Sequence, residues 1–205
     1  EDLMWYPAEV DVSIRPGWFY HSSEDDKVKS FEELKDIYLR SVGGNAMLLL
    51  NIPPTKEGLI HQEEEKSLTK LGEYIRKSFS YNLMDKANME VSNYAEGHEI
   101  LNSIEDSYES YYKTEDGKTN TEIIITWPDT LEISYIVMKE NILLSQRIEK
   151  YEVVINSEKD ECVLYEGTTV GYKKIIPLIK VKTNKVIIRI LDARVSGTLS
   201  FLGIY

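Results

Sequence analysis

Residues 5–21 read Trp-Tyr-Pro-Ala-Glu-Val-Asp-Val-Ser-Ile-Arg-Pro-Gly-Trp-Phe-Tyr-His. From Glu9 to Arg15, polar residues alternate with apolar β-branched ones, which predicts a β-strand with its polar side chains on one face. Pro16-Gly17 then predicts a turn, and an aromatic cluster follows it. Two carboxylates, a guanidinium and aromatic rings at one strand end indicate a site for a polar ligand with a flat apolar side, a description that sugars fit.

The composition is that of a globular protein, with 42% hydrophobic and 29% charged residues among 205. The net charge of −11 disfavours nucleic acid and anionic membranes as partners. No apolar run approaches the ~20 residues that a membrane span needs. The single cysteine, Cys162, lies in a strand-like run and is expected to be a buried, inert thiol. The three histidines are widely spaced and give no metal-ligand pattern.

The first 80 residues predict two strand–helix units. Ser30 begins a capping-box pattern at the start of a helix that ends at Gly43-Gly44. The apolar run Ala46–Ile52 is typical of a buried parallel strand, and a second helix is predicted from about Gln62 to Phe79. The order indicates two βα units of a parallel sheet. Because a two-stranded parallel sheet leaves its faces and edges bare, we expect this segment to be the end of a larger sheet.

From about Tyr81, short β-rich runs replace the helical pattern. The predicted strands are Thr121–Trp127, Leu131–Val137, Tyr151–Ile155, Cys162–Tyr165, Ile175–Lys182, Val186–Leu191 and Leu199–Ile204. Turn residues such as Pro128-Asp129 lie between them and favour an antiparallel β-sandwich. We therefore predict an α/β domain over residues 1–80 and an all-β domain over residues 81–205.

Several motifs resemble those of the glycoside hydrolase family 29 α-L-fucosidases. The matching residues are Pro7–His21, Tyr38, Ser41–Asn45, Leu49–Pro54, Gly58-Leu59, Ser145–Ile148, Thr169–Lys173 and Leu202–Tyr205. The run Pro7–His21 is most similar to the branch that cleaves α-1,3/1,4-linked fucose. The matches after Ser80 resemble the C-terminal sandwich of that branch more loosely.

The resemblance implies a (β/α)8 TIM barrel followed by a galactose-binding-like β-sandwich, of which this chain holds the last barrel units and the sandwich. It implies a retaining α-L-fucosidase whose substrate is a fucosylated glycan. The family's nucleophile is an aspartate in a Trp-Phe-Asp-Gly motif, and this sequence has no such motif. We therefore expect a missing N-terminal portion of the same enzyme to supply it, and this chain alone to be catalytically incomplete. The start at Glu1 suggests processing or truncation. The substrate class suggests a secreted or cell-surface protein.

Glu9 and Asp11 are the carboxylates of the candidate site. Retaining glycosidases need two carboxyl groups roughly 5–5.5 Å apart. Residues two apart on one strand have Cα atoms about 6.5–7 Å apart, and a single strand rarely brackets a sugar from both sides. Glu9 is therefore considered only as an acid/base opposite an upstream aspartate, and Asp11 as a substrate-binding residue. The alternative is that both are barrel-interior residues paired with Arg15 or with neighbouring strands.

Arg15, Trp18 and His21 complete the candidate substrate-binding set. Arg15 can bind a sugar hydroxyl or a carboxylate through two nitrogens, or form a purely structural ion pair. Trp18 is the ring expected to cover the C6 methyl or the apolar face of fucose, whereas Phe19 and Tyr20 better suit loop anchors. His21 is expected to hydrogen-bond near the site or to stabilise the loop. Asn51 either faces the site or caps Pro53-Pro54.

The second domain is expected to be mainly structural. A carbohydrate-binding role is the alternative, with core packing as the simpler explanation for its aromatic residues. Oxygens suited to calcium occur on Glu96, Asp106, Glu115 and Asp116. Their spacing fits no motif, so we predict no cofactor and no metal. For the whole chain, the competing hypotheses are a non-catalytic carbohydrate-binding fragment and a paralogue that kept the fold and lost the chemistry.

Overall fold

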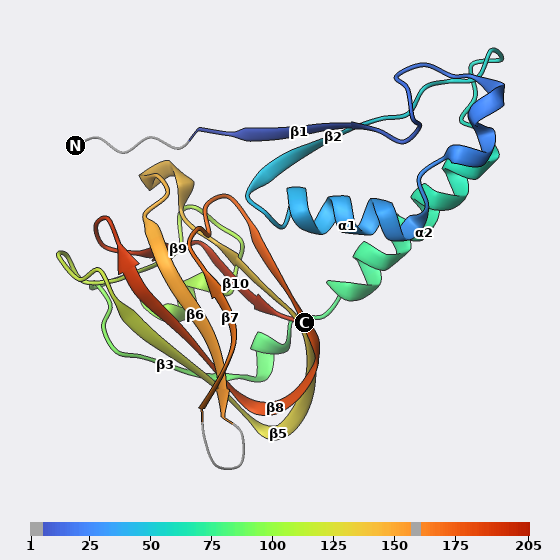
Figure 1. Cartoon of the computed structure of the whole chain (residues 1–205). Helices are drawn as coiled ribbons and strands as arrows, with labels where there is room; N and C mark the ends of the chain where they lie inside the picture. The colour runs from blue at the N-terminus through green and yellow to red at the C-terminus, as the bar shows by residue number, and fades with distance from the viewer. Residues whose placement is uncertain (1–5, 157–160) are drawn as a thin grey trace. The chain divides into compact units, whose positions relative to one another are not determined.

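The computed structural model describes residues 6–156 and 161–205, which are mostly β-structure (Figure 1). They form two compact units. Pro7–Ser80 make up the first unit, and nearly all of the second comes from Tyr81–Tyr205. Trp5, the first residue of the stretch 5–21, lies outside the described residues.

In the first unit, each of two parallel strands is followed by a helix. Strand β1 (Ala8–Ser13) pairs in parallel with β2 (Ala46–Asn51). Helix α1 (Phe31–Ser41) follows β1, and α2 (Gln62–Ser78) follows β2. A 3-10 helix, η1 (Ser22–Lys27), precedes α1. The predicted order of strand, helix, strand and helix is therefore observed.

The start of α1 is set by the capping box that the sequence predicted. The Ser30 Oγ accepts a hydrogen bond from the Glu33 N–H, and the Glu33 carboxylate accepts one from the Ser30 N–H at 2.8 Å. These bonds to the ionised carboxylate lower the pKa of Glu33. Two otherwise unpaired N–H groups of the first turn are satisfied in this way.

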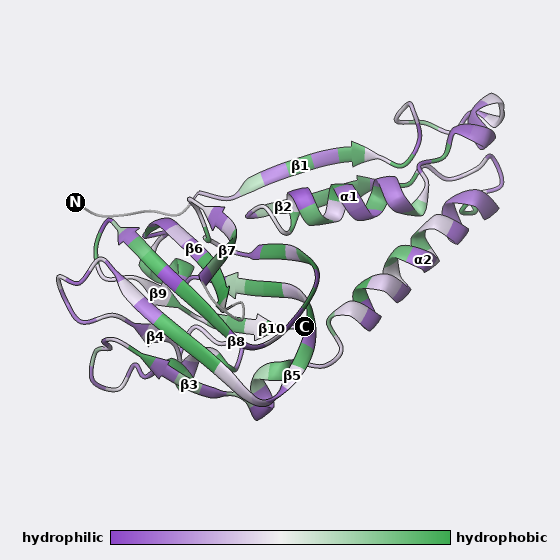
Figure 2. Cartoon of the chain, turned by 60° about the horizontal axis from the view of Figure 1, so that its bottom comes forward, coloured by the Kyte–Doolittle hydropathy of each residue, from purple (hydrophilic) through white to green (hydrophobic). Residues whose placement is uncertain are grey.

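The core of the first unit lies on one side of the strand pair. Its buried residues are Ile14, Leu34 and Leu71. Partly buried side chains pack around them: Val28, Phe31, Tyr38, Leu50, Ile52, Leu68, Tyr74 and Ile75. Figure 2 shows hydrophilic and hydrophobic stripes along α1 and α2, as expected for helices with one buried face. The helices thus cover one face of the strand pair and leave the other uncovered by this unit.

The second unit is an antiparallel β-structure built around two long strands. These are β5 (Thr121–Lys139) and β8 (Lys174–Ala193), which pair with each other along most of their length. The shorter strands are β3 (Asn88–Val91), β4 (Tyr112–Lys113), β6 (Ile148–Asn156), β7 (Glu161–Gly167), β9 (Thr198–Leu199) and β10 (Phe201–Ile204). The main sheet has the order β10-β5-β8-β6-β7, β3 also pairs with β5, and β4 pairs with β9. The described residues of this unit also form three short 3-10 helices: η2 (Leu83–Lys86), η3 (Ile100–Ser103) and η4 (Ile142–Leu144).

Each long strand passes from one layer of the sandwich to the other. The first part of β5 pairs with β3, and its last part pairs with β10. The register with β8 shifts between Thr126 and Leu131 and again between Ile133 and Tyr135. Figure 1 shows both strands curving at this point. Strands that bend at register shifts can serve two packed layers, so the predicted sandwich is formed by two shared strands.

This arrangement corrects two boundaries of the sequence prediction. Pro128-Asp129 was expected to be a turn between two strands, but the strand continues through it as part of β5. The runs Ile175–Lys182 and Val186–Leu191 likewise belong to the single strand β8. The turn signals mark bends, because a proline that lacks an N–H is tolerated where the ladder of hydrogen bonds is interrupted.

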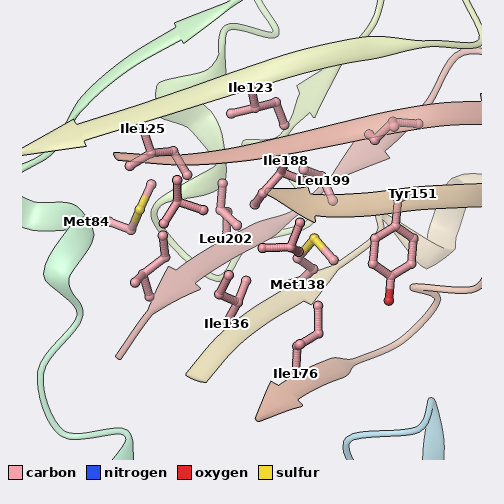
Figure 3. Close-up of a cluster of buried hydrophobic side chains, with 14 of the residues drawn as sticks. Met84, Ile123, Ile125, Ile136, Met138, Tyr151, Ile176, Ile188, Leu199 and Leu202 are labelled. Atoms are coloured by element: carbon pink, nitrogen blue, oxygen red, sulfur yellow. The ribbon is translucent and has the colours of Figure 1, made fainter. Parts of the chain in front are cut away.

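The sandwich core is rich in β-branched residues. Side chains from both parts of β5 (Ile123 and Ile136) meet those of β8 and β10 (Ile188 and Leu202) in one buried cluster (Figure 3). Burying one such side chain fully contributes about 1.5–3 kcal/mol. Figure 2 shows the hydrophobic residues concentrated along β5 and β8. The predicted burial of Cys162 was wrong, because its thiol is exposed on β7.

Candidate functional site

Glu9 and Asp11 lie on the uncovered face of the parallel strand pair. The register places Glu9 beside Met47 and Asp11 beside Leu49, so these four side chains share one face. Both carboxylates are exposed, and 54% of Met47 and 52% of Leu49 are also exposed. Within the described parts of the chain, neither carboxylate has an ion-pair partner. The predicted polar face therefore exists, and two large apolar side chains accompany it.

Arg15 differs from these carboxylates because its side chain is fully buried. Its Nε donates to the Glu64 carboxylate, Nη2 donates to Asp25 at 3.0 Å, and Nη1 donates to the His21 carbonyl oxygen at 3.2 Å. Burial by itself lowers the pKa of Arg15, but the hydrogen bonds and charges of Glu64 and Asp25 outweigh it and raise that pKa. These contacts support the ion-pair alternative for Arg15, and a sugar contact for this residue stays a prediction.

Residues 16–21 form a loop with three aromatic side chains, called the aromatic loop below. Two of the rings are exposed to solvent, and the third contacts other residues of this unit. Trp18 is 52% exposed and Phe19 is 77% exposed. The ring of Tyr20 lies 4.6 Å from the Arg15 guanidinium, and its hydroxyl donates to Asp25 at 3.4 Å. Tyr20 thus anchors the loop as predicted, whereas Phe19 is exposed in this chain and its anchor role stays a prediction. His21 contributes its backbone carbonyl to Arg15, and its side chain is exposed.

The loop between β2 and α2 meets the aromatic loop through His61. Its ring centroid lies 6.2 Å from that of Tyr20, and its Nε2 lies 3.5 Å from an Asp25 oxygen. The Nδ1 of His61 accepts from the Glu63 N–H, so the neutral ring carries its proton on Nε2, facing Asp25. Because both loops follow the carboxyl ends of parallel strands, they meet at one edge of the sheet. This is the edge where α/β proteins place their binding sites.

Asp25 and Glu64 are site-forming residues that the sequence analysis missed. Glu64 is fully buried, and its second carboxylate oxygen accepts from the His61 N–H at 3.2 Å as part of a capping box. The spacing of His61 and Glu64 could have indicated this box, although histidine is an unusual residue at its first position. Nothing local to Asp25 distinguishes it from its acidic neighbours in η1. Only the fold brings it to Arg15.

Only some of the side chains considered as calcium ligands in the second domain lie close together in the structure. Glu96, Glu115 and Asp116 line a cleft of about 640 Å³ beside Tyr94, whereas Asp106 pairs with Lys139 at 2.6 Å. Asp116 is neutralised by Lys113 at 2.7 Å. Among the described residues, no group of three or more His, Cys, Asp or Glu side chains is arranged to hold a metal ion. In the same residues, no helix is long and apolar enough to cross a membrane.

Comparison with known proteins shows which proteins this chain resembles in sequence and in fold. Residues 2–80 match the family model described as Alpha-L-fucosidase. A crystal structure from Bacteroides thetaiotaomicron superimposes with a TM-score of 0.92 at 36% identity, over 97% of this chain and 44% of that one. Over the portion that it spans, the chain is similar in sequence and in fold to α-L-fucosidases.

Two relatives illustrate the similarity. Alpha-L-fucosidase 1 of Arabidopsis thaliana is 34% identical over 98% of this chain. A Ruminococcus gnavus GH29 fucosidase, solved in complex with fucose, has a TM-score of 0.89 and 31% identity over 98% of this chain. The chain spans 41% of the length of each of these relatives. The similarity therefore concerns a portion of such an enzyme.

Proposed function

We propose that this chain is the C-terminal portion of a retaining α-L-fucosidase, which removes terminal fucose from glycans. The observation that carries the proposal is the family match over residues 2–80, which covers the strand pair and both of its loops. The fucose complex of a relative that the chain resembles over nearly its whole length supports the substrate. The sandwich accounts for the rest of the chain.

We place β1 and β2 as the last strands of a (β/α)8 barrel whose other strands lie on a preceding portion of the enzyme. The uncovered face of the pair supports this placement, because exposed Met47 and Leu49 are unusual on a soluble surface. In a barrel, this face points inward and the loops after β1 and β2 lie at the active-site end. Glu9 and Asp11 then line the barrel interior below that end.

In this proposal, an aspartate on the preceding portion attacks the anomeric carbon of fucose. A second carboxyl group protonates the leaving oxygen, and the covalent intermediate is then hydrolysed by water. Glu9 is the candidate for the acid/base role, and Asp11 is a candidate for binding a sugar hydroxyl. Trp18 covers an apolar side of the sugar with its exposed indole, and His21 contributes a polar group at the same loop.

Finer features of the function follow the resemblance of Pro7–His21 to one branch of the family. We propose that the enzyme prefers α-1,3/1,4-linked fucose, needs no cofactor, and acts outside the cell or at its surface. A comparison of α-1,2-linked with α-1,3/1,4-linked oligosaccharides as substrates tests the linkage preference directly.

Expression of this chain alone and together with the preceding portion of its gene product tests the main proposal. We expect fucose release from an aryl α-L-fucoside only when both portions are present. Fucose release by the chain alone would show that it carries its own nucleophile. If the complete protein binds fucosides without cleaving them, the alternative of a non-catalytic carbohydrate-binding protein is correct.

A further inference from the structure

The carboxyl ends of β1 and β2 are joined by two polar side chains. Ser13 and Asn51 are partners in the parallel register, and both lie at the last positions of their strands. The Asn51 Nδ2 donates to the Ser13 Oγ at 3.1 Å and to the Trp18 carbonyl oxygen at 3.0 Å. The backbone of Asn51 is itself fixed, because its carbonyl oxygen accepts from the Ile14 N–H at 3.0 Å. Asn51 therefore connects the rigid strand pair to the residue that presents the exposed indole.

The chemistry of the partners determines which way the Asn51 amide points. Ser13 has one hydroxyl proton, and it donates that proton to the Gly17 carbonyl oxygen at 2.7 Å. Its Oγ also accepts from the Arg15 N–H at 3.3 Å, so it needs a donor from Asn51. The Trp18 carbonyl can only accept. Both contacts thus require the NH2 side of the amide, and an oxygen at that position would face two acceptors.

These bonds act on the first half of the aromatic loop, and the Arg15 cluster acts on the second half. Ser13 holds Gly17, Asn51 holds Trp18, and Arg15 holds the carbonyl of His21. Among the described contacts of Trp18, the bond from Asn51 is the one that ties its own backbone to a strand. The indole itself is 52% exposed, so its direction depends on where the backbone of Trp18 is held.

We propose that Asn51 is a positioning residue for Trp18, acting through the Trp18 carbonyl to set where the indole stands beside the sugar. The substrate role of Trp18 rests on the proposed function, whereas the positioning step rests on the hydrogen bonds alone. An indole that covers the sugar equally in the ground state and the transition state affects KM rather than kcat. Loss of the Asn51 amide is therefore expected to weaken substrate binding and to leave the chemical step intact.

The test uses Asn51→Asp in the complete enzyme, since aspartate has the same shape and lacks the two N–H donors. Gln62→Glu is the matched control, because it makes the same amide-to-carboxylate change at an exposed position. With an aryl α-L-fucoside, Asn51→Asp is expected to raise KM by roughly tenfold and to change kcat by less than about twofold. A purely structural role would instead lower kcat with the folded fraction and leave KM unchanged.

A double-mutant cycle shows whether Asn51 acts through Trp18. In a Trp18→Ala background, Asn51→Asp is expected to have no further effect on KM. An unchanged KM for the single variant, or an equal effect in both backgrounds, would overturn the proposal.

A second readout does not depend on activity. In protein labelled with 5-fluorotryptophan, the ¹⁹F resonance of Trp18, assigned by its loss in Trp18→Phe, is expected to shift or broaden in Asn51→Asp but not in Gln62→Glu. If the complete protein proves to lack fucosidase activity, the proposed function fails and this resonance alone decides the positioning role. An unchanged resonance would then refute it.

Discussion

Replacing Glu140 with glutamine is expected to change how the stability of the second unit depends on pH. Glu140 is fully buried after the end of β5, where its carboxylate binds three backbone N–H groups. Oε1 accepts from Arg147 at 2.7 Å and from Ile148 at 2.9 Å, and Oε2 accepts from Gly171 at 2.7 Å. One side chain thus joins the segment before β6 to the segment before β8.

The sign of the pH effect follows from the environment of the carboxylate. Burial raises the pKa of Glu140 from 4.5 to about 6, although the three N–H groups partly offset it. Because the pKa is higher in the folded state, the contribution of Glu140 is complete below about pH 4.5 and is lost as the pH rises through about 6. The difference between these two pKa values corresponds to a change of about 2 kcal/mol in the free energy of unfolding.

The glutamine side chain carries no charge, so position 140 no longer makes the stability of the protein depend on pH. Its oxygen can keep the bonds to Arg147 and Ile148, but its NH2 group then faces the buried N–H of Gly171, which costs about 1–3 kcal/mol. We therefore expect Glu140→Gln to be less stable than the parent by about that amount at pH 4. The gap is expected to shrink by about 2 kcal/mol by pH 7.5.

Urea unfolding at several pH values, followed by the fluorescence of the buried Trp127 and by circular dichroism, measures this gap. Glu149→Gln is the control, because Glu149 forms an exposed pair with Arg194 that contributes less than about 1 kcal/mol. A gap that stays constant with pH would refute the reasoning. A gap that widens as the pH rises would show that the three N–H groups outweigh burial.

Four further predictions follow from the structure. Glu64→Gln leaves the buried Arg15 without one of its charged partners and is expected to destabilise the first unit by about 3–5 kcal/mol in urea unfolding; an effect below about 1 kcal/mol would contradict the buried pair. Ile136→Ala removes a fully buried core side chain and is expected to cost about 2–5 kcal/mol by the same assay. Trp18→Ala in the complete enzyme is expected to raise KM for an aryl fucoside while the melting temperature changes little, because the indole is half exposed. Cys162 is expected to react with a thiol reagent in the native protein as fast as a free thiol does, and protection until unfolding would contradict its exposure.

Local patterns were sufficient to locate most elements of the fold. The alternation in residues 9–15 and the Ser30 capping box marked β1 and α1 within one or two residues. Both signals depend on contacts between neighbours in the sequence, so they can be read without the tertiary structure. The turn signal at Pro128-Asp129 misled because a proline at a bend in a strand and a proline in a turn look alike in sequence.

The candidate site was predictable in its location and only partly in its roles. The sequence placed Glu9, Asp11, Arg15 and Trp18 at one strand end, whereas in the structure Glu9 and Asp11 lie within β1 and Arg15 and Trp18 follow its carboxyl end. It could not separate the exposed carboxylates from the buried guanidinium, because burial depends on which distant residues arrive beside each position. Asp25 and Glu64 reach Arg15 from 10 and 49 residues away.

The order of side chains along the chain therefore determined by itself the strand–helix alternation, the change to β-structure after Ser80 and the aromatic loop at a strand end. These features arise from backbone periodicity and from caps that act over a few residues. The tertiary structure alone decided that Arg15 is a buried anchor, that β5 and β8 each serve two layers, and that Asn51 holds Trp18. Those outcomes depend on long-range packing and on the pairing of buried polar groups, for which no local pattern exists.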